Sequence, residues 1–128
     1  MSDTIGTVMI TQQQINERAA EIGKQIKEDL NGEPVVLVGI LRGAVLWMAD
    51  IMKNTDLEMT IDFMAVSSYG SAKKTSGVVK INKDLDTDIE GKNVIIVEDI
   101  VDSGYTLNYL KGYFKSREAK TVKICTLL

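Results

Sequence analysis

The chain has 128 residues, with 15 Lys and Arg against 18 Asp and Glu, no histidine and a single cysteine. This length fits one domain, and 45% hydrophobic with 26% charged residues excludes disordered, collagen-like and coiled-coil classes. The composition also excludes catalysis through an imidazole base, zinc sites rich in His or Cys, and an intramolecular disulfide. The groups that remain available for catalysis or ligand binding are carboxylates, hydroxyls, Lys or Arg, backbone amides and a hard cation.

Charge and targeting signals favour a cytoplasmic protein. A net charge of -3 gives no reason to expect nucleic-acid binding. The longest apolar runs, Val35 to Leu41 and Ala44 to Ala49, are far shorter than the ~20 residues that cross a bilayer, and Met1 to Thr4 shows no secretory signal. The lone Cys125, on an apolar strand, fits a reducing compartment and is interpreted as core filler.

In chain order, the first predicted element is a helix that begins at the capping box Thr11 to Gln14 and ends at Asn31-Gly32. The continuous apolar run Val35 to Ile40 predicts a strand covered on both faces, as in a parallel sheet. A short helix from Ala44 to about Lys53 and a strand from Met59 to Val66 follow.

The second half continues the alternation. A polar loop from Ser67 to Gly77 leads to a third strand, Val78 to Asn82, and a buried strand follows at Asn93 to Val97. After a helix with Leu107, Leu110 and Phe114 on one side, the last strand is predicted at Thr121 to Leu128. The predicted fold is α/β, a doubly wound, mostly parallel sheet flanked by helices in one domain, 1-128. Its ligand crevice lies outside the carboxyl ends of the strands.

The segment Val94 to Thr106 carries the clearest chemical signal. A buried strand delivers Glu98 and Asp99 to the carboxyl edge of the sheet, and Asp102 follows closely. The turn from Ser103 into a helix at Thr106 offers a glycine, two hydroxyls and outward-pointing amides, which suit a phosphate dianion. Three carboxylates beside a phosphate would repel it, so a Mg²⁺ cofactor is expected.

This segment resembles the motif with which type I phosphoribosyltransferases bind phosphoribosyl pyrophosphate, in the form found in hypoxanthine-guanine phosphoribosyltransferases. Gly39 to Ala44 resembles the family's pyrophosphate-binding loop, and Asp62 to Gly70 resembles the start of its mobile loop. The resemblance implies purine salvage: Mg²⁺-dependent transfer of the phosphoribosyl group to hypoxanthine or guanine, giving IMP or GMP and pyrophosphate. It also implies a homo-oligomer, a dimer or tetramer, with small-molecule substrates.

The resemblance further implies roles for single residues. Glu98 and Asp99 engage the ribose hydroxyls and the water shell of the metal, and Asp102 is the general base for the purine. For the ribose 5′-phosphate, the family pattern points to the run Asp102, Ser103, Gly104, Tyr105 and Thr106.

The other two motifs have implied roles as well. Leu41, Arg42 and Gly43 bind the pyrophosphate, with the Leu41-Arg42 peptide strained and often cis. Arg42 stands at a helix start, where the dipole disfavours a cation, so an anionic ligand is the better explanation for it. Ser68 and Tyr69 close over the site.

The family continues well past the last strand, and this chain stops at Leu128. We therefore expect a C-terminally truncated form that keeps affinity for phosphoribosyl pyrophosphate but has weak or no purine selectivity. Two alternatives stay open. One is a non-catalytic module of the same fold that binds phosphoribosyl pyrophosphate or nucleotide, or is regulatory. The other is a receiver-type signalling domain, which expects an acidic pair where this chain has Arg42.

Overall fold

The computed structural model describes residues 11-68, 79-99 and 105-127. These residues form three helices and five strands, and each corresponds to an element expected from the sequence. In order they are α1 (Gln12–Asp29), β1 (Val35–Ile40), α2 (Val45–Asn54), β2 (Met59–Ser68), β3 (Val79–Lys83), β4 (Asn93–Glu98), α3 (Tyr105–Ser116) and β5 (Thr121–Thr126).

The strands form one five-stranded sheet in the order β3-β2-β1-β4-β5. Strand β1 lies at its centre and pairs in parallel with β2 and β4, and β5 pairs in parallel with β4. Only β3 is antiparallel, paired with β2. The predicted mostly parallel α/β sheet is therefore confirmed. All six residues of β1 are buried, as its continuous apolar sequence predicts.

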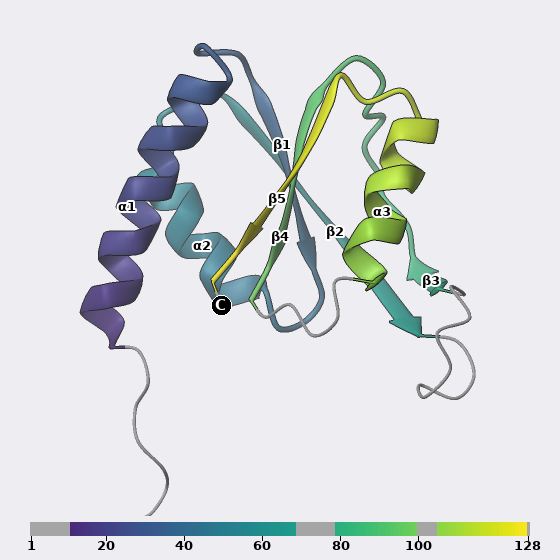
Figure 1. Ribbon diagram of the computed structural model, residues 1–128, viewed down its shortest axis with the longest axis horizontal. Coiled ribbons are helices and arrows are strands. Elements are labelled where there is room, and N and C mark those ends of the chain that lie inside the picture. Colours follow the sequence, from purple (N-terminus) through teal and green to yellow (C-terminus); the bar gives the residue numbers. More distant parts are fainter. Residues whose placement is uncertain (1–10, 69–78, 100–104, 128) are drawn as a thin grey trace, which may run out of the picture.

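The helices cover both faces of the sheet, with α1 and α2 on one side and α3 on the other (Figure 1). Each face has its own apolar core. On the first, Ile22, Trp47 and Ile51 pack against the sheet, and on the second Leu110 and Phe114 do so. This two-sided burial fixes the register of the central strands, because a slip by one residue would exchange the two faces.

Helix α1 begins with the predicted capping box. The Thr11 hydroxyl accepts from the Gln14 amide at 3.1 Å, and the Gln14 side chain accepts from the Thr11 amide at 2.8 Å. At Gly23 the helix lies so close to α2 that a Cβ there would sit 2.1 Å from the carbonyl oxygen of Asn54. Helices α1 and α2 thus form a tightly packed pair that supports the sheet from one side.

The ends of strands β2 and β5 differ from the sequence prediction by two residues, and β3 and the end of β4 differ by one. Strand β2 continues to Ser68, because Ser67 and Ser68 pair with Lys80 and Val79 of β3 and so satisfy backbone groups that a loop would leave to water. Strand β5 ends at Thr126, two residues early. Within the described ranges, none of the helices is both long and apolar enough to cross a membrane.

Candidate functional site

The candidate site lies where β1 and β4 end side by side. These strands are parallel neighbours with Gly39 opposite Val97, so their carboxyl ends meet at one edge of the sheet. The predicted pyrophosphate turn follows β1 directly, and Glu98 is the last residue of β4. Segments from the two halves of the chain are thereby brought to one place, as expected for a ligand crevice in an open α/β sheet.

Gly43 and Asp99 make the closest approach between these segments. A Cβ added at Gly43 would lie 2.7 Å from one carboxylate oxygen of Asp99 and 3.0 Å from the other. Atoms do not pack that closely, so only glycine at this position lets the carboxylate rest against the turn. The family resemblance places Gly43 among the residues that bind pyrophosphate, and the structure adds that this glycine makes room for Asp99.

The turn that begins at Leu41 is anchored by its backbone. The Leu41 amide donates to the Met64 carbonyl of β2 at 2.8 Å, and the Val45 amide donates to the Arg42 carbonyl at 3.3 Å. The Leu41-Arg42 peptide is cis, as the family resemblance implies. The Arg42 side chain is exposed, and within the described residues its guanidinium takes part in no hydrogen bond or ion pair. It is therefore available to an anion from solution.

The acid pair at the end of β4 is half-buried. The Asp99 amide donates to a carboxylate oxygen of Glu98 at 3.0 Å, which holds the bend between the two residues. No cluster of three or more Asp, Glu, Cys or His residues with metal-binding geometry occurs in ranges 11-68, 79-99 and 105-127. Two adjacent carboxylates still suit Mg²⁺, which commonly takes one or two protein carboxylates together with waters and substrate phosphates.

The remaining predicted site residues are described only in part. Thr106 lies half-buried in the first turn of α3, and Tyr105 begins that helix. Ser68 is the last residue of β2, opposite Val79 of β3. The predicted residues Tyr69, Asp102, Ser103 and Gly104 lie outside the described residues.

Comparison with known proteins decides the family. The model of the phosphoribosyl transferase domain matches residues 8-128. The chain belongs to the phosphoribosyltransferase family. The hypoxanthine-guanine phosphoribosyltransferase of Bacillus subtilis is 44% identical over the whole chain, which spans 71% of that relative, and the one from Streptococcus thermophilus is 47% identical over 96% of the chain and 68% of the relative.

Solved structures of such phosphoribosyltransferases agree with this fold. A Bacillus anthracis hypoxanthine-guanine phosphoribosyltransferase, crystallised with HEPES in its active site, matches with a TM-score of 0.90 at 42% identity, over 97% of this chain and 73% of the other. A Trypanosoma cruzi hypoxanthine phosphoribosyltransferase, solved in work on its C-terminal region, matches with a TM-score of 0.90 at 32% identity, over 98% and 70%. The resemblance read from the sequence is confirmed.

Two polar features of this phosphoribosyltransferase were missed from the sequence. Asp62 of β2 is buried, and its carboxylate accepts hydrogen bonds from the backbone amides of Phe63, Asp86 and Thr87 at 2.8 to 2.9 Å. Burial raises the pKa of Asp62, but these hydrogen bonds outweigh it and hold the pKa below its usual value. The second feature is the hydrogen bond from the Tyr113 hydroxyl of α3 to Asp84. The sequence did contain a signal for each feature: Asp62 is a carboxylate within a largely apolar strand, and Tyr113 is a tyrosine on a helix.

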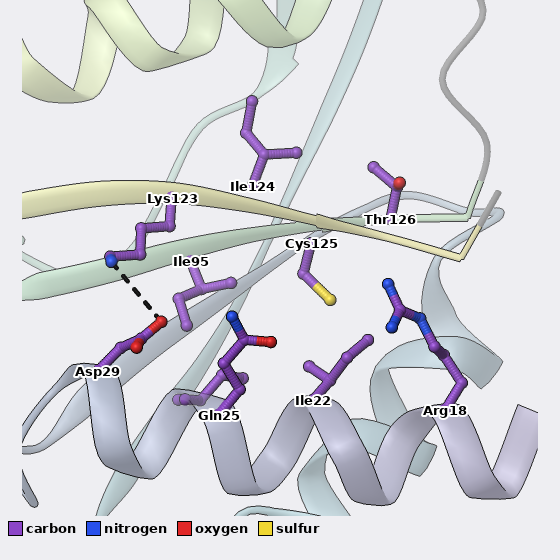
Figure 2. A pocket seen from close by; sticks show the side chains of 10 residues that line it. Arg18, Ile22, Gln25, Asp29, Ile95, Lys123, Ile124, Cys125 and Thr126 are labelled. Atoms are coloured by element: carbon purple, nitrogen blue, oxygen red, sulfur yellow. Dashed lines mark ion pairs between the residues drawn. The ribbon is translucent and has the colours of Figure 1, made fainter.

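A cavity of about 300 Å³ lies elsewhere, between α1 and β5 (Figure 2). The ion pair of Lys123 with Asp29, at 3.9 Å, stands at one end and Arg18 at the other. The Cys125 thiol points from β5 toward Ile22 of α1, and burial raises its pKa to about 11. The interpretation of Cys125 as a core residue is confirmed, and Thr126, which also lines the cavity, pairs with Glu98 of β4.

Proposed function

We propose that this chain binds phosphoribosyl pyrophosphate and transfers its phosphoribosyl group to hypoxanthine or guanine, giving IMP or GMP and pyrophosphate in purine salvage. The observation that carries the proposal is the contact of Gly43 with the Asp99 carboxylate. It joins a turn suited to a pyrophosphate and a carboxylate suited to a ribose diol at one edge of the sheet. Phosphoribosyl pyrophosphate carries both groups on adjacent atoms.

Arg42 is the residue that would neutralise the pyrophosphate. It is exposed, takes part in no hydrogen bond or ion pair with the described residues, and stands one residue from Gly43. The Leu41-Arg42-Gly43 backbone would bind the same group. Because a cation that faces the departing group stabilises charge that develops as the bond breaks, Arg42 would act on the transition state more than on the bound substrate.

Glu98 and Asp99 would hold Mg²⁺ through its waters and accept from the ribose hydroxyls. When bound, Mg²⁺ supplies positive charge that offsets the pyrophosphate and the two carboxylates. Their position supports this role, because Glu98 ends β4 and Asp99 follows it directly, at the edge where open α/β sheets bind ligands.

Asp102 and the start of α3 would complete the reaction. Residues Ser103, Gly104, Tyr105 and Thr106, with the first amides of α3, would hold the 5′-phosphate. One ring nitrogen of the purine would attack the anomeric carbon as the bond between that carbon and the pyrophosphate oxygen breaks. That electron pair leaves with pyrophosphate, and the carboxylate of Asp102 takes the proton released from the purine ring.

Calorimetry tests this proposal. Phosphoribosyl pyrophosphate titrated into the chain with Mg²⁺ should give saturable binding, and Asp99→Asn should weaken it about tenfold or more, because a charged hydrogen-bonding partner is lost. No binding by the wild type would contradict the proposal. Added hypoxanthine then separates enzyme from sensor: an enzyme forms IMP and loses this on Asp102→Asn, whereas a non-catalytic module binds without forming IMP.

We further propose a cytoplasmic homo-oligomer. On α2, Leu46 is 80% and Val45 is 41% exposed, and association would remove such apolar surface from water. Analytical ultracentrifugation would test it: a monomer at micromolar concentration would contradict the oligomer.

A further inference from the structure

Helix α3 is joined to the segment between β3 and β4 by a group we call the Tyr113 cluster, which comprises Tyr113, Asp84 and Arg117. The Tyr113 hydroxyl donates to the Asp84 carboxylate. The Arg117 guanidinium donates to Asp84 at 3.2 Å and to the Tyr113 hydroxyl at 2.9 Å, and it lies 5.5 Å from the centre of the Tyr113 ring. All three side chains are thus fixed by contacts with the other two.

The charge state of the cluster agrees with this geometry. Burial and the hydrogen bond to Asp84 raise the pKa of Tyr113. Burial also tends to raise the pKa of Asp84, but hydrogen bonds from Tyr113 and the Leu85 amide, together with Arg117, bring it below its usual value. The cluster therefore holds a carboxylate, a neutral phenol and a guanidinium at neutral pH, which is the state in which all its hydrogen bonds form.

The segment that carries Asp84 is itself bound to the sheet. Its Asp86 and Thr87 amides donate to the buried Asp62 carboxylate of β2 at 2.9 and 2.8 Å. Lys83 donates to the Phe63 carbonyl at 3.1 Å. Figure 1 shows this segment running beside α3. The Tyr113 cluster therefore connects α3 to β2 through a segment that is itself hydrogen-bonded to β2.

The other side of α3 is held by apolar contacts. Leu107, Leu110 and Phe114 pack into the core beneath it. Such contacts keep a helix on a sheet but are non-directional, so they restrain its tilt and rotation less than hydrogen bonds do. Within the described residues, Tyr113 is the α3 residue whose side chain hydrogen-bonds outside the helix, to Asp84 and to Arg117, which follows the helix and itself donates to Asp84.

We propose that Tyr113, Asp84 and Arg117 are positioning residues for the 5′-phosphate of the substrate, a role that rests on the proposed function. Thr106 stands seven residues before Tyr113, about 10 Å along the helix. A tilt of about 5° about Tyr113 would move the first turn by nearly 1 Å, and misplacements of that size weaken ligand binding and catalysis. The turn at Leu41 lies between β1 and α2, so it would not move with α3.

The test compares two tyrosines on the same helix. Tyr113→Phe removes the hydroxyl and keeps the ring. Tyr109→Phe is the matched control, because Tyr109 is 39% exposed, stacks on Tyr113 with ring centres 6.4 Å apart, and forms no hydrogen bond through its hydroxyl within the described part of the chain. Each variant is titrated separately with ribose 5-phosphate and with pyrophosphate, both with Mg²⁺.

Tyr113→Phe should weaken ribose 5-phosphate binding about threefold to tenfold, the loss expected for one hydrogen bond, and leave pyrophosphate binding within about twofold. Tyr109→Phe should leave both unchanged within about twofold. Asp84→Ala, which removes the acceptor from an exposed segment, should repeat the selective loss. The selectivity separates positioning from a general loss of stability, which would weaken both ligands.

Three outcomes overturn the inference. If Tyr113→Phe and Asp84→Ala bind both ligands as the wild type does, the cluster does not position the helix. If they weaken both ligands equally, the cluster is only structural. If the wild type binds neither ligand, the proposed function fails and the inference fails with it, so the two failures are distinguishable.

Discussion

Replacing Gly43 with alanine puts a methyl group where the Asp99 carboxylate now rests. The new Cβ would lie 2.7 Å from one carboxylate oxygen and 3.1 Å from the carboxyl carbon, whereas ordinary contact begins at 3.4 Å. The carboxylate must therefore move by about 0.7 Å or more. Because it is the free end of a short side chain, rotation can relieve the overlap, and the free energy of unfolding should fall by less than about 1 kcal/mol.

Ligand binding should suffer far more than folding. A displacement near 1 Å at a residue that orients substrate can cost two orders of magnitude in rate, and we expect affinity for phosphoribosyl pyrophosphate with Mg²⁺ to fall about tenfold. Isothermal titration calorimetry measures the affinity, and urea denaturation of the same sample measures the stability. The expected pattern is a large change in the first with a small change in the second.

Gly112→Ala is the matched control. A Cβ at Gly112 meets nothing within 4 Å, and the residue lies inside α3, so alanine should raise stability by about 0.5 to 1 kcal/mol and leave affinity unchanged. The reasoning is refuted if Gly43→Ala binds as tightly as the wild type. It is equally refuted if affinity falls only in proportion to the fraction of unfolded protein.

Three further predictions concern the scaffold. Gly23→Ala should destabilise the chain by about 1 to 3 kcal/mol in urea denaturation, because its Cβ would meet the Asn54 backbone; an unchanged midpoint would show the helix pair to be loosely packed. The pKa of Asp62 is lowered in the fold, so as pH falls this carboxylate is protonated in the unfolded chain before it is protonated in the folded one. The free energy of unfolding should therefore fall as pH drops below about 4. Asp62→Asn should make that fall shallower, and an equal slope would contradict the role of Asp62. With its pKa near 11, Cys125 should react with a thiol reagent at pH 8 far more slowly in the native than in the urea-unfolded protein, and equal rates would contradict its burial.

The order and type of the elements could be predicted because periodicity reports burial directly. The unbroken apolar runs of β1 and β4 indicated strands covered on both faces, and their burial is complete or nearly so. Parallel neighbours end at one edge, which is why the turn after Ile40 and the acids after Val97 could be expected to meet. The end of β2 was missed because Ser67 and Ser68 are polar, and only pairing with β3 makes them a strand.

Side-chain contacts between distant segments were beyond the sequence. Gly43 and Asp99 stand roughly 55 residues apart, and no local pattern gives their separation in space. Tyr113 and Arg117 have the spacing of neighbours on one helix face, a signal that could have been noticed. Their acceptor, Asp84, becomes adjacent only because Asp62 binds the segment that follows it.

The pairing of β1 with β4 has a consequence for how ligand and folding are linked. A ligand held by the Arg42 turn and by Asp99 bridges two strands at the centre of the sheet, so local fraying at its edges cannot release it. Ligand at a hundred times its dissociation constant should then stabilise the whole domain by about 2.7 kcal/mol. Hydrogen exchange should then slow at the amides of β1 and β4, whose exchange requires the centre of the sheet to open, whereas amides of the edge strand β5 that exchange by local fraying should keep their rates.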